Sequence, residues 1–288
     1  ESPAYRRTVS LVETFGAGGL IFGPGRPLTQ IELANALQAT AERPLLVAQD
    51  TEWGVGMRID EATSFPPAMA IGATRDASHA FRVGYVTARE ARALGVHQLY
   101  APVADVNNNP ENPIINIRSF GGAPPLVGTM ASAFVRGAQA GGTLATVKHF
   151  PGHGDTDVDS HLNLPILRFD RARLDSLELP PFRQALDAGA RSVMTGHLAL
   201  PALAADSVPA TLSRPLTHDL LRDDLGFDGL VVTDALNMKA VTRTFGVGET
   251  AVRVLEAGAD LVLMSTDPWG AHDAIRTAVT TGRLDTTQ

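Results

Sequence analysis

The chain has 288 residues, 44% of them hydrophobic and 19% charged, as expected for a globular protein with a large buried core. The net charge of −7 and the lack of a basic run argue against nucleic acid as a partner. No apolar run is long enough to span a membrane, and no cysteine is present for disulfides or thiol chemistry.

The first residues show neither the basic start nor the apolar stretch of a signal peptide, and their pattern begins in mid-helix. We therefore expect a segment upstream of residue 1 to be missing. The compartment stays open between exported and cytoplasmic.

Apolar runs and polar breaks divide the chain into alternating strands and helices. A helix is expected to end near residue 15, closed by Gly16 and Gly18. Short runs that are apolar on both faces predict seven buried strands, at residues 19–22, 45–48, 98–103, 144–147, 192–195, 229–233 and 260–264. Helical patterns follow at residues 29–41, 78–94, 124–140, 170–188 (broken at Pro180 and Pro181), 217–225, 249–257 and 271–280.

This alternation predicts an α/β fold with a parallel sheet. A (β/α)8 TIM-type barrel needs eight strands, so seven strands after a helix fragment indicate a barrel whose first strand is missing from this chain. A doubly wound open sheet is the alternative, but no G-x-G-x-x-G segment follows any strand. No linker or internal repeat divides the chain, so we expect one domain.

The stretch from Lys148 to His161, KHFPGHGDTDVDSH, is the densest in groups that move protons, bind metals or hold hydroxyls. His149 and His153 have the spacing of a helical zinc site, but Pro151 and two glycines disfavour a helix there. The three aspartates resemble the start of an EF-hand loop, but its glycine and glutamate positions are not met. A solvated turn-rich loop is the plainest alternative.

Acid–base catalysis is the third interpretation of this stretch. Asp159 and His161 are separated by one residue, and a carboxylate can hold an imidazole in one tautomer and raise its basicity. Lys148 is one of only two lysines in the chain, and a compact ammonium group suits the binding of ligand hydroxyls. His153 and Asp155 are expected to shape the loop.

The stretch KHFPGHGDTDVDSH resembles glycoside hydrolase family 3, in its branch of β-N-acetylglucosaminidases, and the resemblance covers nearly the whole chain. In that branch a His–Asp pair on a mobile loop replaces the usual glutamate acid/base. The resemblance implies that residues 1–288 form one N-terminal catalytic barrel domain, without cofactor or metal. Relatives often carry a second domain, so a further C-terminal domain absent from this chain is also implied.

The resemblance also assigns site residues. Asp234, in GLVVTDALNM, matches the family's nucleophile; from position alone it could equally be a helix cap. Asp159 and His161 match the acid/base pair. The residues that match substrate-binding positions are Asp50, Arg58, Arg118, Lys148 and His149, with His197 as a further candidate at a strand end.

Two of these matches have alternatives. Asp50 and Arg58 keep the family's eight-residue spacing, but the segment reads TEWGVGMR where relatives have Gly-Gly-Arg. Arg118, in INIRSFGG, could instead form a salt bridge across the barrel mouth. Trp53 either flanks the sugar or packs. Because these residues follow different strands, we expect them to converge on one pocket at one end of a barrel.

The function implied is that of a retaining exo-β-N-acetylglucosaminidase. Its substrates would be GlcNAc-containing oligosaccharides from cell-wall muropeptides or chitin, cleaved through a covalent glycosyl-aspartate intermediate. A phosphorylase is a close alternative, since a histidine tolerates phosphate as nucleophile better than a glutamate does. A catalytically silent sugar-binding barrel and a metal-dependent hydrolase are further alternatives.

Overall fold

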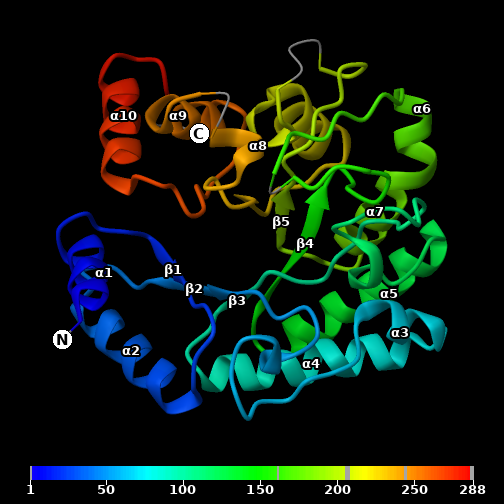
Figure 1. The fold of residues 1–288 in the computed structure, drawn as a ribbon, viewed down its shortest axis with the longest axis horizontal. Helices are drawn as coiled ribbons and strands as arrows, with labels where there is room; N and C mark the ends of the chain where they lie inside the picture. The colour runs from blue at the N-terminus through cyan, green and yellow to red at the C-terminus, as the bar shows by residue number, and fades with distance from the viewer. Residues whose placement is uncertain (1, 161, 205–207, 243–244, 286–288) are drawn as a thin grey trace.

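The computed structural model describes the whole chain except residues 1, 161, 205–207, 243–244 and 286–288. In the described part, six parallel strands form one sheet in chain order. They are β1 (Gly19–Ile21), β2 (Leu46–Gln49), β3 (Gln98–Leu99), β4 (Leu144–Phe150), β5 (Ser192–Thr195) and β6 (Leu230–Thr233). The sheet curls, with helices along its outer side (Figure 1), as in part of a TIM-type barrel.

The seventh expected strand, at residues 260–264, is not assigned as a strand. Leu261 forms a single parallel bridge to Val232 beside β6. Side-chain hydrogen bonds replace part of the backbone ladder here. The Asp260 carboxylate accepts from the Val231 N–H, and Thr233 Oγ1 accepts from the Leu263 N–H. At Met264 the backbone turns away with a φ of 52°. An eighth strand is likewise not among the described residues, so the sheet is a part-barrel.

Two other strands differ from their expected bounds by more than one residue at an end. The third was expected to run to residue 103, but β3 ends at Leu99, with one further bridge from Val103 to Lys148. Pro102 cannot donate to a ladder, which explains the interruption. The fourth was expected to end at residue 147, but β4 continues to Phe150, so Lys148 and His149 lie within the strand.

The helices are α1 (Pro3–Glu13), α2 (Pro27–Thr40), α3 (Ala68–Ala73), α4 (Ala77–Ala93), α5 (Pro124–Ala140), α6 (Arg171–Arg173), α7 (Leu179–Asp187), α8 (Lys239–Thr242), α9 (Val247–Glu256) and α10 (Pro268–Thr280). Short 3₁₀ turns are η1 (Val55–Met57), η2 (Asn116–Arg118) and η4 (Ala210–Leu212), and π-helical segments are η3 (Leu174–Glu178) and η5 (Pro215–Asp224). None of the helices described is long and apolar enough to cross a membrane.

The helix expected at residues 170–188 is not broken at its prolines. The π-helical η3 joins α6 to α7, and Pro180 and Pro181 fall in the first turn of α7. Pro180 and Pro181 have no backbone N–H to donate to the preceding turn, and the helix passes them by widening into η3, where the Leu179 N–H donates to the Leu174 carbonyl oxygen. The helix expected at 217–225 is the π-helical η5.

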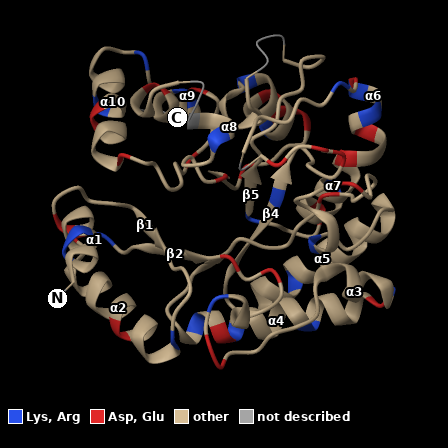
Figure 2. Ribbon diagram, in the orientation of Figure 1, with Lys and Arg blue, Asp and Glu red and all other residues tan. Residues whose placement is uncertain are grey.

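The core fills the space between sheet and helices, with Phe134, Phe150 and Phe182 fully buried. Helices α4 and α5 pack closely, because an added Cβ at Gly84 or Gly137 would collide with the backbone of the other helix. Charged residues of both signs lie along the helices, and β4 carries a basic residue into the centre of the molecule (Figure 2). The parallel strands therefore direct their carboxyl ends, and the polar residues there, towards one region.

Candidate active site

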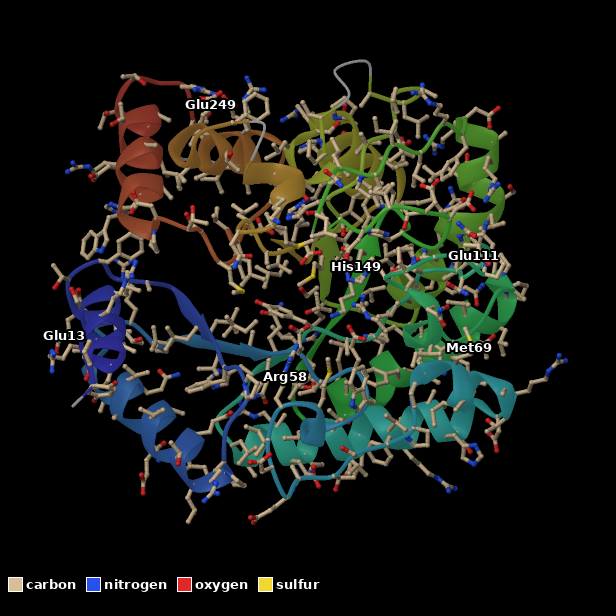
Figure 3. All side chains as sticks on the ribbon, in the orientation of Figure 1. Glu13, Arg58, Met69, Glu111, His149 and Glu249 are labelled. Atoms are coloured by element: carbon tan, nitrogen blue, oxygen red, sulfur yellow. The ribbon has the colours of Figure 1, made fainter. Side chains whose placement is uncertain are left out.

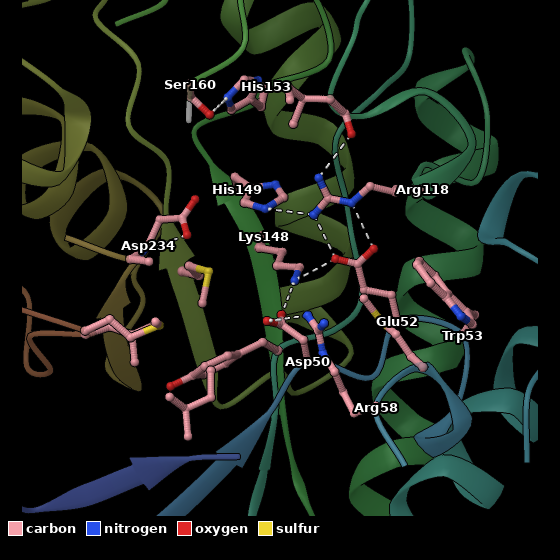
Figure 4. A pocket seen from close by; sticks show the side chains of 18 residues that line it. Asp50, Glu52, Trp53, Arg58, Arg118, Lys148, His149, His153, Ser160 and Asp234 are labelled. Carbon is pink, nitrogen blue, oxygen red and sulfur yellow. Dashed lines mark hydrogen bonds and ion pairs between the residues drawn. The ribbon is translucent and has the colours of Figure 1, made fainter. Parts of the chain in front are cut away.

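A cavity of about 310 Å³ lies at the carboxyl ends of the strands. Six predicted site residues line it: Asp50, Arg58, Arg118, Lys148, His149 and Asp234. Figure 3 shows His149 and Arg58 near the middle of the molecule, and Figure 4 shows the cavity itself. The remaining lining is Ile21, Glu52, Trp53, Met57, Tyr100, Ile114, His153, Ser160, Met194, Ala235, Leu263 and Met264.

Lys148 is the buried centre of a charge network on one wall of the cavity (Figure 4). Its Nζ lies 3.0 Å from Asp50 Oδ1 and 2.7 Å from Glu52 Oε1. Arg58 approaches the other oxygen of Asp50 at 3.2 Å. Burial would lower the pKa of Lys148, but Asp50 and Glu52 hold it above its ordinary value, so the ammonium stays charged.

Arg118 forms a two-pronged contact with Glu52, from Nε at 2.9 Å and from Nη2 at 2.8 Å. Burial would raise the pKa of Glu52, but Lys148 and Arg118 hold it well below its usual range. Arg118 therefore forms a salt bridge and also lines the cavity, so the two interpretations of this residue are compatible. Its Nη1 also donates to the Ile114 carbonyl oxygen, and its Nη2 lies 3.4 Å from His149 Nε2, so the planar guanidinium is held in one orientation.

His149 is oriented by the buried carboxylate of Asp105. Its Nδ1 lies 2.7 Å from Asp105 Oδ2, and its backbone N–H donates to the same group. Burial would raise the pKa of Asp105, but the charge and hydrogen bond of His149 hold it lower. A carboxylate on Nδ1 fixes that nitrogen as a donor and directs Nε2 towards the cavity.

Asp234 follows β6 directly and faces His149 across the cavity (Figure 4). It is not a helix cap, because the next helix, α8, begins only at Lys239. Burial would raise the pKa of Asp234, but His197, His149, the Ala235 N–H and Lys148 together hold it below its ordinary value. Asp234 is thus an ionised carboxylate that lines the cavity.

His197 does not line the cavity, contrary to the prediction. It is fully buried, with Nδ1 2.9 Å from Thr211 Oγ1 and Nε2 3.0 Å from the Ala235 carbonyl oxygen. Since a carbonyl only accepts, Nε2 carries the proton. His197 therefore supports the backbone beside Asp234.

The acid/base candidates are only partly described. His161 lies outside the described residues. Asp159 is half-buried and does not line the cavity, whereas its neighbour Ser160 does. His153 and Asp155 shape the loop as expected: His153 contacts Thr156 and Ser160, and Asp155 contacts Asn108 and Arg173.

Three cavity or support residues were not predicted: Glu52, Tyr100 and Asp105. Each lies a few residues after the end of a strand, and this position was the sequence feature that could have identified it as a site residue. Burial, with Asp50 and Asp234 nearby, raises the pKa of Tyr100, so its phenol stays neutral. Trp53 lines the cavity beside Glu52, which favours a place next to a ligand over simple packing.

Among the described residues, one group of side chains could hold a metal ion, and it lies outside the cavity. Ligand atoms of His218, Asp219 and Asp223 lie within 4.8 Å of one another on η5. None of the three lines the cavity. The carboxylate of Asp155, which opened the EF-hand interpretation, is already paired with Arg173.

The chain resembles known proteins over most of its length. Beta-hexosaminidase A of Pseudoalteromonas piscicida is 39% identical over 255 residues, which cover 81% of this chain and 43% of that protein. The beta-N-acetylglucosaminidase/beta-glucosidase of Cellulomonas fimi is 37% identical, with 80% and 43% covered. The chain thus spans less than half the length of these two relatives.

Solved structures agree with these similarities. A glycoside hydrolase family 3 beta-N-acetylglucosaminidase from Paenibacillus superposes with a TM-score of 0.94 at 43% identity, covering 97% of this chain and 55% of that one. A beta-glucoside phosphorylase superposes with a TM-score of 0.94 at 28% identity, covering 100% and 53%. The profile of the glycosyl hydrolase family 3 N-terminal domain matches residues 5–288, and the chain therefore belongs to glycoside hydrolase family 3.

Proposed function

We propose that this chain is the catalytic domain of a retaining exo-β-N-acetylglucosaminidase. The observation that carries the proposal is Asp234, a half-buried carboxylate held ionised, facing a small cavity whose other wall is a set of paired charges. A family 3 relative with a TM-score of 0.94 is named a beta-N-acetylglucosaminidase, which supports the sugar assigned here.

In the proposed reaction, Asp234 attacks the anomeric carbon and forms a glycosyl ester while the glycosidic bond breaks. The leaving oxygen takes a proton from His161, whose imidazole is oriented by Asp159. The neutral imidazole then removes a proton from water, which attacks the same carbon and releases Asp234. Two displacements at one carbon retain its configuration.

The charge network would bind the sugar hydroxyls. Asp50 and Glu52 can accept hydrogen bonds, while Lys148, Arg118 and Arg58 can donate them, and all five side chains line the cavity. Because each charge is already paired, the network presents fixed donors and acceptors rather than free ions. A cavity of about 310 Å³ suits one terminal sugar, which supports exo cleavage.

Phosphorolysis is the second candidate function. The similarity to a beta-glucoside phosphorylase at a TM-score of 0.94 favours it. A histidine in the acid/base position does not repel phosphate as a carboxylate would. Phosphate would then take the place of water in the second displacement.

Product analysis tests the proposal. Chitobiose and GlcNAc-β-1,4-MurNAc are each incubated with the protein, with and without phosphate. We expect free GlcNAc from at least one disaccharide in both conditions; GlcNAc-1-phosphate would establish phosphorolysis instead. Failure to cleave either disaccharide or a nitrophenyl GlcNAc glycoside would support the silent sugar-binding barrel.

A further inference from the structure

A buried hydrogen-bond network lies under the loop that carries Asp159. At its centre is His153, which is 1% exposed. Its Nδ1 lies 2.8 Å from Thr156 Oγ1, and its Nε2 lies 3.0 Å from Ser160 Oγ. Both ring nitrogens are therefore engaged within the loop, and neither the binding of hydroxyls nor the proposed proton transfer uses them.

The partners fix the tautomer of this ring. Thr156 Oγ1 has one proton, which it donates to the carbonyl oxygen of His153 at 3.1 Å. The tautomer that satisfies both contacts of Thr156 Oγ1 therefore has the ring proton on His153 Nδ1. Burial and the nearby His149 lower the pKa of His153 to about 4, so the ring is neutral. Its Nε2 is then an acceptor, and Ser160 donates its hydroxyl proton to it.

Asn112 ties this network to the neighbouring loop. Its Nδ2 donates to the carbonyl oxygens of His153 and Gly154, both at 2.9 Å, and lies 3.3 Å from Thr156 Oγ1. Asn112 is 1% exposed, so these contacts are shielded from water. The backbone N–H of His153 donates at 2.8 Å to Asp105, the carboxylate that also orients His149. The base of the loop and the sugar-binding histidine thus share one anchor.

Ser160 stands between Asp159 and His161 in the sequence, and it lines the cavity. We propose that His153 and Ser160 are positioning residues, whose hydrogen bond sets the position of Asp159, the carboxylate proposed to orient the acid/base histidine. This inference rests on the function proposed above, and it concerns placement of the acid/base pair rather than the chemistry itself. A bond to the side chain of Ser160 restrains the backbone of Asp159, which is directly bonded to it.

Substitutions at both ends of the bond test the inference. Ser160→Ala removes the donor. His153→Asn keeps a polar group near the Nδ1 position but cannot reach Ser160, whereas His153→Gln places an amide oxygen near the Nε2 position and can still accept. The measurement is kcat/KM for chitobiose, which needs a proton on its leaving group, and for a dinitrophenyl GlcNAc glycoside, which leaves unaided.

We expect Ser160→Ala and His153→Asn to lower kcat/KM for chitobiose about tenfold, a barrier change of about 1.4 kcal/mol. For the dinitrophenyl glycoside, kcat/KM should fall by less than about threefold, because its leaving group departs without a proton from the acid/base pair. His153→Gln should recover most of the chitobiose activity. The double variant Ser160→Ala/His153→Asn should lose no more than either single variant, because both remove the same bond.

Ser176→Ala is the matched control, because Ser176 is exposed and donates only to the Arg173 carbonyl oxygen. Equal losses on both substrates, or no recovery in His153→Gln, would overturn the positioning role and leave a merely structural one. Retained activity on the dinitrophenyl glycoside shows that each variant is folded.

The two proposals fail in different ways. If the unaltered protein does not hydrolyse GlcNAc glycosides, the proposed function is wrong. If the unaltered protein is active and Asp234→Asn is inactive, but the substrate-dependent loss is missing in Ser160→Ala, only the positioning role is wrong.

Discussion

Asp234 carries its charge where burial opposes one, and the surrounding groups explain why. The histidines at 149 and 197, Lys148 and one backbone N–H together outweigh the cost of burial and lower the pKa of this carboxyl. A nucleophile must be ionised at the pH of reaction, so the residues that bind sugar in our proposal also prepare the attacking group.

The acid/base assignment gives a prediction at the residue scale. His161→Ala should lower kcat/KM far more for a natural disaccharide than for a nitrophenyl glycoside, because only the disaccharide needs a proton on its leaving group. Asp159→Asn should show a milder form of the same pattern, since the imidazole stays but loses its orienting charge. Equal losses on both substrates would mean that the proton comes from another group.

Glu52 gives a prediction about stability and pH. Burial opposes its charge, but Lys148 and Arg118 hold its pKa below the ordinary value of 4.5. A carboxyl with a lower pKa in the folded chain adds stability above its unfolded pKa, and that stability is lost as the pH falls. Glu52→Gln should therefore lower the free energy of unfolding by about 3 kcal/mol at pH 7 and by progressively less below pH 4.5.

Urea unfolding at pH 7, 5, 4 and 3 measures the difference in free energy of unfolding between Glu52→Gln and the unaltered protein. Glu42→Gln serves as the control, because Glu42 is exposed and should leave the pH dependence unchanged. A difference between Glu52→Gln and the unaltered protein that stays constant from pH 7 to 3 would contradict the charge network described here.

The sequence predicted individual site residues mainly from their position at the end of an expected strand. Asp50 and Asp234 directly follow parallel strands, Lys148 lies near the end of one, and the structure places all three on one cavity. Glu52 and Asp105 were missed because their importance lies in partners distant in sequence, Arg118 and His149. His197 also follows a strand, yet its ring bonds Thr211 and the Ala235 carbonyl oxygen and does not line the cavity. Position after a strand does not determine where a side chain points.

At the scale of elements, most helices were predictable because their caps and apolar faces are local features. The helix at 124–140 has the expected bounds, opened by a proline. The π-helical turn before Pro180 was not predictable, because it depends on how the chain packs beyond its local pattern. The segment at 260–264 reads as a strand, but side-chain hydrogen bonds replace part of its ladder.

The loop after β4 shows why composition alone was ambiguous there. Its glycines argued against a helix, but Gly154 also has a packing role. An added Cβ at Gly154 would collide with the carbonyl oxygen of Val106. Only glycine allows the base of this loop to lie so close to the segment that follows β3.

The contact between α4 and α5 gives a prediction with a definite sign. On helix propensity alone, Gly137→Ala would stabilise α5 by about 1 kcal/mol. The new Cβ would instead collide with the carbonyl oxygen of Phe81, so we expect destabilisation by about 1–3 kcal/mol. Gly128→Ala in the same helix is the matched control, because its Cβ meets only the flexible end of Gln184. Thermal unfolding of both variants and the unaltered protein measures these changes in stability. A Gly137→Ala variant more stable than the unaltered protein would refute the close contact between α4 and α5.

The whole molecule explains how distant parts of the sequence reach one site. Six parallel strands, taken in chain order, bring residues from position 50 to position 234 to one end of a curled sheet. The fold class followed from the alternation of short apolar runs with amphipathic helices. Closure of the sheet did not follow from it, because closure depends on pairing between segments at opposite ends of the chain.

The most direct test of the central claim is to identify the residue that becomes glycosylated. The protein is incubated with a slow fluorinated GlcNAc glycoside carrying a good leaving group, then digested and analysed by mass spectrometry. We predict one added sugar on the peptide containing Asp234, none in Asp234→Asn, and a rate for Asp234→Asn that is lower by several orders of magnitude. A label on any other residue, or an Asp234→Asn variant that keeps more than about a tenth of the rate, a change of only about 1.4 kcal/mol, would contradict the account.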